Sequence, residues 1–219
     1  MPRLPPGHGP LRDRDLGAVM DALAAVIVPK GELEWGTPYQ LLVAVVLSAQ
    51  CTDKAVNAAT RPLFARAGTP AAMLRLGEAR LAEAIRTIGL WRAKARHVIG
   101  LSRLLLDRHG GEVPGERAAL EALPGVGRKT AAVVLNIAFG QPTIAVDTHV
   151  QRVATRLGIV RTTAPERTEA VLEARIPERH RLHAHHYFIL HGRYTCTARA
   201  PRCGACPVAP WCGSRREPA

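Results

Sequence analysis

The chain of 219 residues has few aromatic residues, few lysines and no long hydrophobic run. Aromatic residues make up only 4% of it and strand-like alternation is scarce, whereas alanine and leucine abound, so we predict an all-α protein. The longest apolar run, Leu41 to Leu47, is too short to span a membrane. Prolines occupy the N-terminus where a signal peptide needs an apolar core. We therefore expect a protein of the cytoplasm or its nucleoid, with no membrane partner.

Acidic residues are also under-represented, because 18 of them face 30 lysines and arginines. The resulting formal charge of +12 is spread along the chain and is not concentrated in one tail. A polyanion is the natural partner of such a protein. The 47% of apolar residues can supply the core of one large or two small domains.

Residues 123–130, with the sequence LPGVGRKT, interrupt a helical pattern with two glycines. Helix formers precede this stretch from Arg117 onwards, and an apolar run that Gly140 can close follows it. The pattern predicts a helix-hairpin-helix, in which backbone N–H groups beside the positive N-terminus of the second helix can hold a phosphate. A loop without a ligand is the alternative. The residues that we expect to contact a phosphate of the polyanion here are Gly125, Val126, Gly127 and Arg128.

Lysine is rare enough for its positions to be informative. Twenty-six of the 30 basic residues are arginines, and the four lysines are Lys30, Lys54, Lys94 and Lys129. A guanidinium stays protonated, whereas an amine can lose its proton and attack carbon, so Lys129 in the predicted phosphate-binding turn is a candidate nucleophile. The alternative for Lys129 is one more contact to phosphate.

Elsewhere in the chain, prolines, glycines and capping residues mark where helices begin and end, and they predict short loops between the helices. The predicted helices span residues 15–28, 38–48, 53–67, 71–76, 78–88, 91–108, 117–123, 130–138, 148–157, 164–174 and 178–191. Met1 to Pro10 contains four prolines and two glycines, which predicts a loose tail.

Four of the five cysteines lie in the last 24 residues with the spacing C-x6-C-x2-C-x5-C. They are Cys196, Cys203, Cys206 and Cys212. Disulfides are not expected in a cytosolic chain, so this clustering indicates a metal site. The spacing alone does not distinguish a tetrahedral zinc ion from a [4Fe–4S] cluster. Three arginines flank or separate the first two cysteines and would face outward from the closed loop: Arg193, Arg199 and Arg202.

The hairpin LPGVGRKTA, the segment AVDTHV, the run HGRYTC and the cysteine tail together closely resemble the endonuclease III family of helix-hairpin-helix DNA glycosylases with lyase activity. The likeness covers Thr37 to Cys212 and includes LLVAVVLSAQ, TIGL and GEVP. It implies a six-helix barrel domain over residues 31–141, and a cluster domain formed by residues 142–219, which the loose tail and N-terminal helix of residues 1–30 join. DNA would bind in the cleft between the two domains. It also implies one [4Fe–4S] cluster on the four cysteines, a monomer, and double-stranded DNA with a damaged base or abasic site as partner.

The resemblance assigns Lys129 as the nucleophile and Asp147, 18 residues further on, as its carboxylate partner. The amine would attack C1′ of the sugar, release an oxidised pyrimidine such as thymine glycol, and leave an imine that drives β-elimination. Asp147 would stabilise the positive charge that develops on the sugar. The simpler reading of Asp147 is an N-cap, and one carboxylate can do both.

A base inside a duplex must be flipped out before it can react. By resemblance, Gln50 and Leu90 fill the gap in the duplex, although apolar packing for Leu90 and a polar helix end for Gln50 are alternatives. His149, Arg199 and Arg202 are candidate DNA contacts. Cys51 departs from the alanine that we associate with this turn, and Ala200 leaves the cysteine loop one cation short of relatives with lysine there.

Two competing functions remain from the sequence alone. A monofunctional adenine-specific relative would lack the hairpin lysine and carry a further C-terminal domain. A non-catalytic DNA-binding module with a structural zinc site is the alternative from another class. His185, His186 and His191 could suggest a second metal site, but adjacent histidines point to different faces of a helix.

Overall fold

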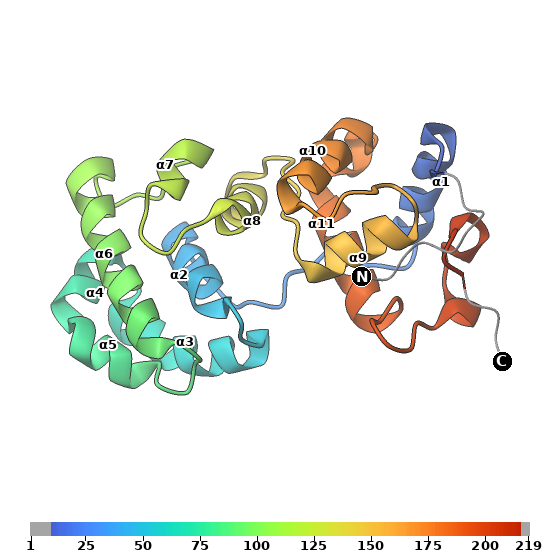
Figure 1. Cartoon of the computed structure of the whole chain (residues 1–219). Helices are drawn as coiled ribbons and strands as arrows, with labels where there is room; N and C mark the ends of the chain where they lie inside the picture. Colours follow the sequence, from blue (N-terminus) through green and yellow to red (C-terminus); the bar gives the residue numbers. More distant parts are fainter. Residues whose placement is uncertain (1–9, 216–219) are drawn as a thin grey trace. The chain divides into compact units, whose positions relative to one another are not determined.

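The computed structural model describes residues 10–215, so residues 1–9 of the predicted loose tail lie outside the described part. Residues 10–215 form eleven α-helices and two short 3₁₀-helices and contain no β-strand, which confirms the all-α prediction (Figure 1). Within this range no helix is both long and apolar enough to cross a membrane. The helices are α1 (Asp13–Ala24), α2 (Pro38–Ser48), α3 (Asp53–Ala67), α4 (Pro70–Leu76), α5 (Glu78–Ala84), α6 (Trp91–His109), α7 (Arg117–Glu121), α8 (Arg128–Phe139), α9 (Thr148–Arg156), α10 (Pro165–Arg175), α11 (Glu178–Tyr194), η1 (Cys203–Ala205) and η2 (Ala209–Trp211).

The chain folds into two compact units, each with its own hydrophobic core. One unit comprises residues 32–141 and contains α2 to α8. The other combines residues 10–31 with residues 142–215, because α1 packs against α11. Helices from the two ends of the chain therefore share one core in the second unit.

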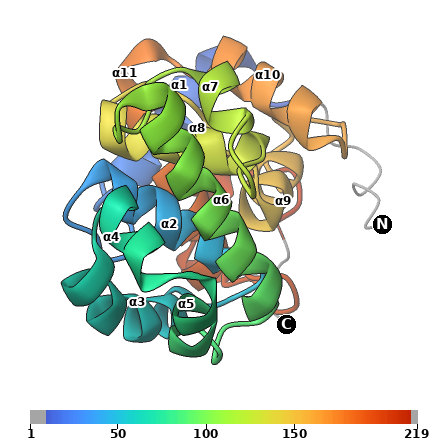
Figure 2. The same ribbon diagram turned by 90° about the vertical axis from the view of Figure 1, so that its left-hand side faces the viewer.

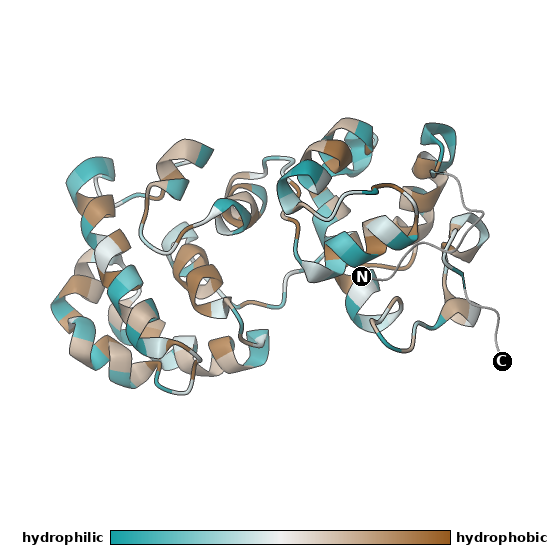
Figure 3. Cartoon of the chain, viewed as in Figure 1, coloured by the Kyte–Doolittle hydropathy of each residue, from teal (hydrophilic) through white to brown (hydrophobic). Residues whose placement is uncertain are grey.

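Helix α2 lies at the centre of the unit of residues 32–141 and packs against α3, α6 and α8. It is hydrophobic along most of its length (Figure 3). The predicted bounds are confirmed, because the Thr37 side chain accepts a hydrogen bond from the Gln40 N–H at 3.2 Å and Pro38 takes the first helical position. Helices α4 and α5 pack along α6, which crosses this unit (Figure 2).

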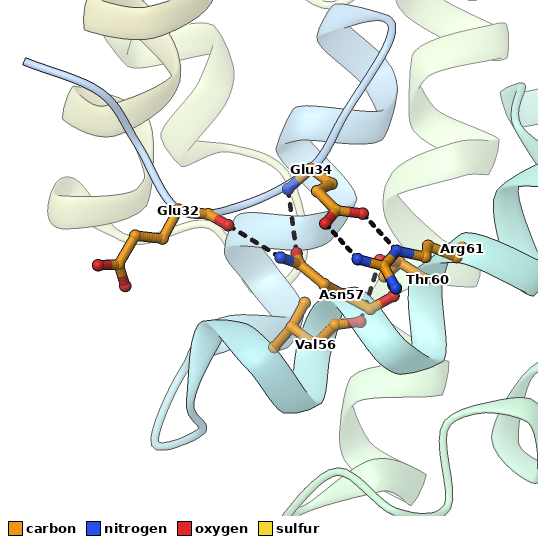
Figure 4. A network of polar contacts seen from close by, with 6 residues as sticks. All are labelled: Glu32, Glu34, Val56, Asn57, Thr60 and Arg61. Atoms are coloured by element: carbon orange, nitrogen blue, oxygen red, sulfur yellow. Dashed lines mark hydrogen bonds and ion pairs between the residues drawn. The ribbon is translucent and has the colours of Figure 1, made fainter.

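The segment with which this unit begins is held to α3 by one buried amide. Asn57 is 8% exposed; its Nδ2 donates to the Glu32 carbonyl at 2.8 Å, and its Oδ1 accepts from the Glu34 N–H at 3.0 Å (Figure 4). The exposed Glu34 carboxylate also pairs with Arg61, which lowers the pKa of Glu34. A surface ion pair contributes little, so the buried Asn57 bonds fix the start of the unit.

Three predicted helix ends differ from the structure by three or four residues, and the other predicted bounds by two residues or fewer. The predicted helix of residues 15–28 ends at Ala24 instead, because the β-branched Val26, Ile27 and Val28 and the following proline favour extended backbone. The predicted helix of residues 78–88 ends at Ala84 and gives way to turns. The predicted helix of residues 178–191 continues to Tyr194, because Gly192 does not end it.

Candidate functional site

The hairpin turn between α7 and α8 is anchored to the core by Val126, whereas Gly125 and Gly127 on either side of it are exposed. The Val126 side chain is 6% exposed and its N–H donates to the Leu123 carbonyl at 3.1 Å. Gly125 has φ of +77°, and a Cβ there would lie 2.9 Å from the His97 Cβ. Glycine is thus required at position 125 by its backbone conformation and by the close approach of α6. Val126, buried and bonded through its N–H, anchors the turn from within.

The N-terminus of α8 has no side-chain cap. Its N-cap residue is Gly127, which is exposed, and the first turn contains no acidic residue. The first bond within the helix runs from the Ala131 N–H to the Gly127 carbonyl at 2.9 Å. The N–H groups of the first turn precede that bond and lie at the positive end of the helix dipole. This geometry can hold an anion such as phosphate.

Lys129 lies in this first turn and is exposed. Its side chain makes no hydrogen bond or ion pair with any residue between 10 and 215. The amine is therefore not committed to a structural contact. A ligand held by the N-terminus of α8 would lie beside a primary amine.

Asp147 caps α9 with only one of its two carboxylate oxygens. Oδ1 accepts hydrogen bonds from the N–H groups of His149 and Val150, both at 2.8 Å. Oδ2 accepts none from the described residues, and the side chain is half-buried. The predicted cap is confirmed. The second oxygen leaves the carboxylate able to interact with a ligand while the cap stays intact.

Gln50 and Leu90 are the non-glycine residues with positive φ in the described part of the chain, at 57° and 60°. Gln50 occupies the third position of a type II turn: Ala49 has φ −53° and ψ 118°, and the Cys51 N–H donates to the Ser48 carbonyl at 2.9 Å. Glycine is the usual residue at that position. Both residues are exposed, Leu90 at 62%. Two strained backbones therefore present the two side chains that the resemblance predicts to enter the duplex.

The strain at Gln50 predicts an unusual effect on stability. A left-handed conformation destabilises the folded state by about 1–2 kcal/mol at a residue other than glycine. Glycine avoids this cost, but it lowers the free energy of unfolding by about 0.4–1 kcal/mol because it makes the unfolded chain more flexible. We expect Gln50→Gly to raise the free energy of unfolding by up to about 1 kcal/mol relative to Gln50→Ala, measured by chemical denaturation. A glycine variant less stable than the alanine variant would show that position 50 is not strained.

All four clustered cysteines line one cavity of about 30 Å³. Among residues 10–215, however, no three Cys, His, Asp or Glu side chains are placed to hold a single metal ion. A zinc ion needs its sulfurs at about 2.3 Å from one centre. The four thiols around one cavity are the donor set that an iron–sulfur cluster uses.

The surroundings of these thiols favour a group that carries positive charge. Burial raises the pKa of the Cys206 and Cys212 thiols. Burial also lowers the pKa of His191, whose Nε2 lies 3.7 Å from the Cys206 Sγ, to about 4. His191 is thus neutral at pH 7 and cannot balance a thiolate. The buried Cys206 and Cys212 thiols become thiolates when a metal replaces their protons.

Two arginines of α9 fix the first cysteine. Arg156 donates to the Cys196 Sγ at 3.3 Å and to the Thr197 carbonyl at 2.7 Å. Arg152 donates to the Cys196 carbonyl at 3.1 Å and to the Gly192 carbonyl at 2.8 Å, and burial lowers its pKa. The start of the cysteine loop is therefore attached to the helix that Asp147 caps.

Two comparisons with known protein families match this chain. The profile of the HhH-GPD superfamily of base excision DNA repair proteins matches residues 43–178, and that of the iron–sulfur binding domain of endonuclease III matches residues 196–212. Endonuclease III of Treponema pallidum is 53% identical over 92% of this chain and 96% of its own length. The chain belongs to the endonuclease III family.

Other members and their structures agree. Endonuclease III of Escherichia coli K12 is 54% identical over 84% of this chain and 87% of its own. The structure of a trapped endonuclease III–DNA covalent intermediate superposes with a TM-score of 0.88 at 43% identity, and covers 93% of this chain and 97% of that one. The chain is therefore a DNA-binding enzyme of base excision repair, a DNA glycosylase with AP lyase activity. The alternative of a non-catalytic module is wrong.

Membership of the endonuclease III family also decides the cofactor, which is one [4Fe–4S] cluster. The matched segment of residues 196–212 begins and ends on a cysteine of the predicted site. The alternative of a structural zinc site is thereby excluded.

Removal of one cysteine should remove the cluster. We expect the purified parent protein to be brown and to contain close to four iron atoms per chain, and Cys206→Ser to be colourless with almost none. Cys51→Ser is the matched control, because Cys51 belongs to the other unit and contacts Lys94 instead. Zinc in place of iron, or loss of iron from Cys51→Ser, would contradict this assignment; visible absorption and metal analysis measure both.

The remaining candidates have less specific surroundings. Arg199 and Arg202 are exposed, as a DNA contact must be. The His149 Nδ1 atom lies 3.2 Å from the Arg152 guanidinium, and the backbone N–H of His149 donates to Asp147. The Nδ1 atom of His185 lies 2.8 Å from the Ala145 carbonyl. The two arginines of α9 were not among the residues predicted from the sequence, although their spacing of four residues places them on one helical face.

Proposed function

We propose that this enzyme removes oxidised pyrimidines of the thymine glycol type from double-stranded DNA and then cleaves the abasic strand. The observation that carries the proposal is the uncommitted amine of Lys129 in the first turn of α8, beside a helix N-terminus suited to phosphate. The trapped covalent complex between a relative and DNA supports a covalent mechanism here as well. An amine is the nucleophile that can form such a bond and later release it.

The Lys129 amine begins the reaction by attacking C1′ after it has lost its proton. The bond between C1′ and the base breaks, and the base leaves with the electron pair and accepts a proton. The sugar ring then opens to a protonated imine between C1′ and the lysine nitrogen. Loss of a proton from C2′ sends its electrons toward the imine, and the C3′–O bond breaks. Water hydrolyses the imine and frees Lys129 for the next cycle.

Asp147 has a separate part in this reaction. Its Oδ2, to which no described residue donates a hydrogen bond, stabilises the positive charge on the sugar as the base departs. The Oδ1 bonds to the first turn of α9 keep the carboxylate in one orientation throughout. We infer that capping serves catalysis by fixing the charge in place.

We propose that DNA is bound through three groups of residues. Gly125, Gly127 and Arg128 hold one phosphate at the hairpin, and Val126 supports them from within. Gln50 and Leu90 enter the duplex where the damaged nucleotide has left it. His149, Arg199 and Arg202 contact the backbone. The protein acts as a monomer, and analytical ultracentrifugation at assay concentrations tests this directly.

We propose that Cys196, Cys203, Cys206 and Cys212 hold the [4Fe–4S] cluster. The bound cluster supplies a cross-link between four points of a short loop, without taking part in the bond changes above. Arg199 and Arg202 belong to the loop so closed. Their position relative to α9 is then set by the thiolates and by the two arginines that bind the Cys196 region.

One panel of duplex oligonucleotides, each with a single defined lesion, tests the substrate class. We expect excision of thymine glycol and other oxidised pyrimidines at least about tenfold faster than of 8-oxoguanine or 3-methyladenine. Each productive reaction should yield a protein–DNA adduct with borohydride, which reduces the imine. Equal excision of purine lesions would contradict the proposed specificity, and the absence of any adduct would contradict the imine.

A further inference from the structure

Lys94 of α6 is buried, at 4% exposure, and has no acidic partner among residues 10–215. Its ammonium donates to the Leu47 carbonyl at 2.9 Å, the Ala49 carbonyl at 2.7 Å and the Cys51 Sγ at 3.4 Å. An ammonium has three donors, and three acceptors meet it here. Hydrogen bonds from all three donors offset much of the free-energy cost of burying the charge, whereas a missing acceptor would leave that cost uncompensated.

The acceptors of Lys94 belong to the C-terminal end of α2. The last turn of α2 contains no basic residue, and the C-cap Ala49 makes no capping N–H bond. The final carbonyls of a helix need donors and carry the negative end of its dipole. Lys94 therefore supplies from α6 the cap that α2 lacks.

Lys94 also connects the two strained turns. Its ammonium binds the residues on either side of Gln50, while its backbone N–H donates to the Leu90 carbonyl at 3.0 Å. The turns themselves approach each other, because a Cβ on Gly89 would lie 3.8 Å from the Cys51 Sγ. One residue thus contacts the backbone or neighbours of both side chains proposed to enter the duplex.

The choice of lysine at this position has a geometric reason. Arginine provides 26 of the 30 basic residues of this chain, yet position 94 has lysine. The acceptors lie around one point, which suits the compact, tetrahedral ammonium. A planar guanidinium is larger and directs its donors along a fork, so it would displace the turn that it bound.

We propose that Lys94 is a positioning residue for base extrusion: it holds Gln50 and Leu90 in the left-handed conformations that present both side chains to the duplex. This inference rests on the proposed insertion of these two residues. Their positive φ angles are unfavourable for side chains other than glycine, so a contact elsewhere must maintain them. The Lys94 bonds provide that contact for the Gln50 turn directly and for Leu90 through the first turn of α6.

The test separates extrusion from chemistry by the choice of substrate. We expect Lys94→Met to slow single-turnover excision from a thymine glycol duplex by at least about tenfold, and to change cleavage of a single-stranded abasic oligonucleotide by less than about twofold. A single strand has no stack to leave, so it needs no inserted side chain. Stopped-flow fluorescence of 2-aminopurine beside the lesion should show slower unstacking in the same variant.

Two further variants control for charge and for folding. Lys54→Met removes an exposed lysine from the neighbouring α3 and should leave 2-aminopurine unstacking unchanged. Lys94→Arg keeps a cation at the end of α2, so it carries less risk of unfolding, and the different shape of its side chain should still slow extrusion. Circular dichroism melting identifies a temperature at which every variant is folded.

The outcomes are distinct. An equal loss on both substrates would show that Lys94 supports only the fold, and a Lys94→Met enzyme as fast as the parent on duplex would also overturn the inference. If Gln50→Ala with Leu90→Ala keeps the parent rate, the proposed insertion itself fails. If that double variant is slow, adding Lys94→Met should slow it by less than about threefold, because residues that act through one another are not additive.

Discussion

Replacement of Lys129 by glutamine is expected to abolish the borohydride-trapped adduct and to lower strand cleavage at abasic sites by at least about three orders of magnitude. Glutamine keeps the helix propensity of lysine and a polar head, but it has no amine with which to form an imine. Because Lys129 is exposed and makes no contact with the described residues, the free energy of unfolding should change by less than about 0.5 kcal/mol. A denaturation curve beside the kinetic trace therefore separates chemistry from folding.

The neighbouring Arg128 provides the matched control for charge. Arg128→Gln removes the same unit of charge from the same helical turn, so it should weaken DNA binding and reduce the salt slope by about 0.9. It should still form the trapped adduct once DNA is saturating. An adduct that persists in Lys129→Gln would assign the nucleophile to another amine. Loss of the adduct from both variants would mean that the turn, and not the lysine, is required.

Several features of the fold could be predicted because local sequence alone determines them. Thr37 and Pro38 mark the start of α2 by capping and by a fixed φ, and the structure has both where they were expected. Gly140 closes α8 in the left-handed conformation, with φ of 64°. These signals act within one turn of helix, so they need no knowledge of distant residues.

Other features depend on contacts between segments far apart in the chain. Gly192 was predicted to end a helix, but a Cβ there would lie 2.9 Å from the His149 Cβ, so the glycine permits α11 to pack against α9. From the sequence, Lys94 stood out only as one of the four lysines, and its role at the end of α2 could not be predicted. Its acceptors lie more than forty residues earlier in the sequence. A sequence pattern does not distinguish a glycine that ends a helix from one that allows close packing.

The cysteine site could also be predicted only in part from the sequence. Four cysteines at these spacings predict a metal site, because four thiolates in one short loop need a cation or a metal cluster to balance their charge. The spacing does not determine the kind of metal, since a zinc ion and an iron–sulfur cluster can both use four sulfurs. Membership of the endonuclease III family decides in favour of the cluster.

Asp147→Asn should lower the single-turnover rate of excision by about 10²- to 10⁴-fold while leaving the protein as stable as the parent. Asparagine is as good an N-cap as aspartate, so its side-chain oxygen should keep the two bonds of 2.8 Å to the first turn of α9. Only the charge and the acceptor at the second oxygen are lost. DNA affinity should stay the same or increase, because removal of a negative charge cannot weaken attraction to a polyanion.

Asp147→Ala completes the comparison, because alanine removes the cap as well as the charge. It should lose about 1 kcal/mol of stability relative to the asparagine variant, yet excise no more slowly once both are folded. Melting curves and single-turnover rates on one lesion duplex measure the two effects separately. If the asparagine variant excised as fast as the parent and only the alanine variant were impaired, Asp147 would act as a cap alone. The charge proposed to stabilise the departing sugar would then have to come from another residue.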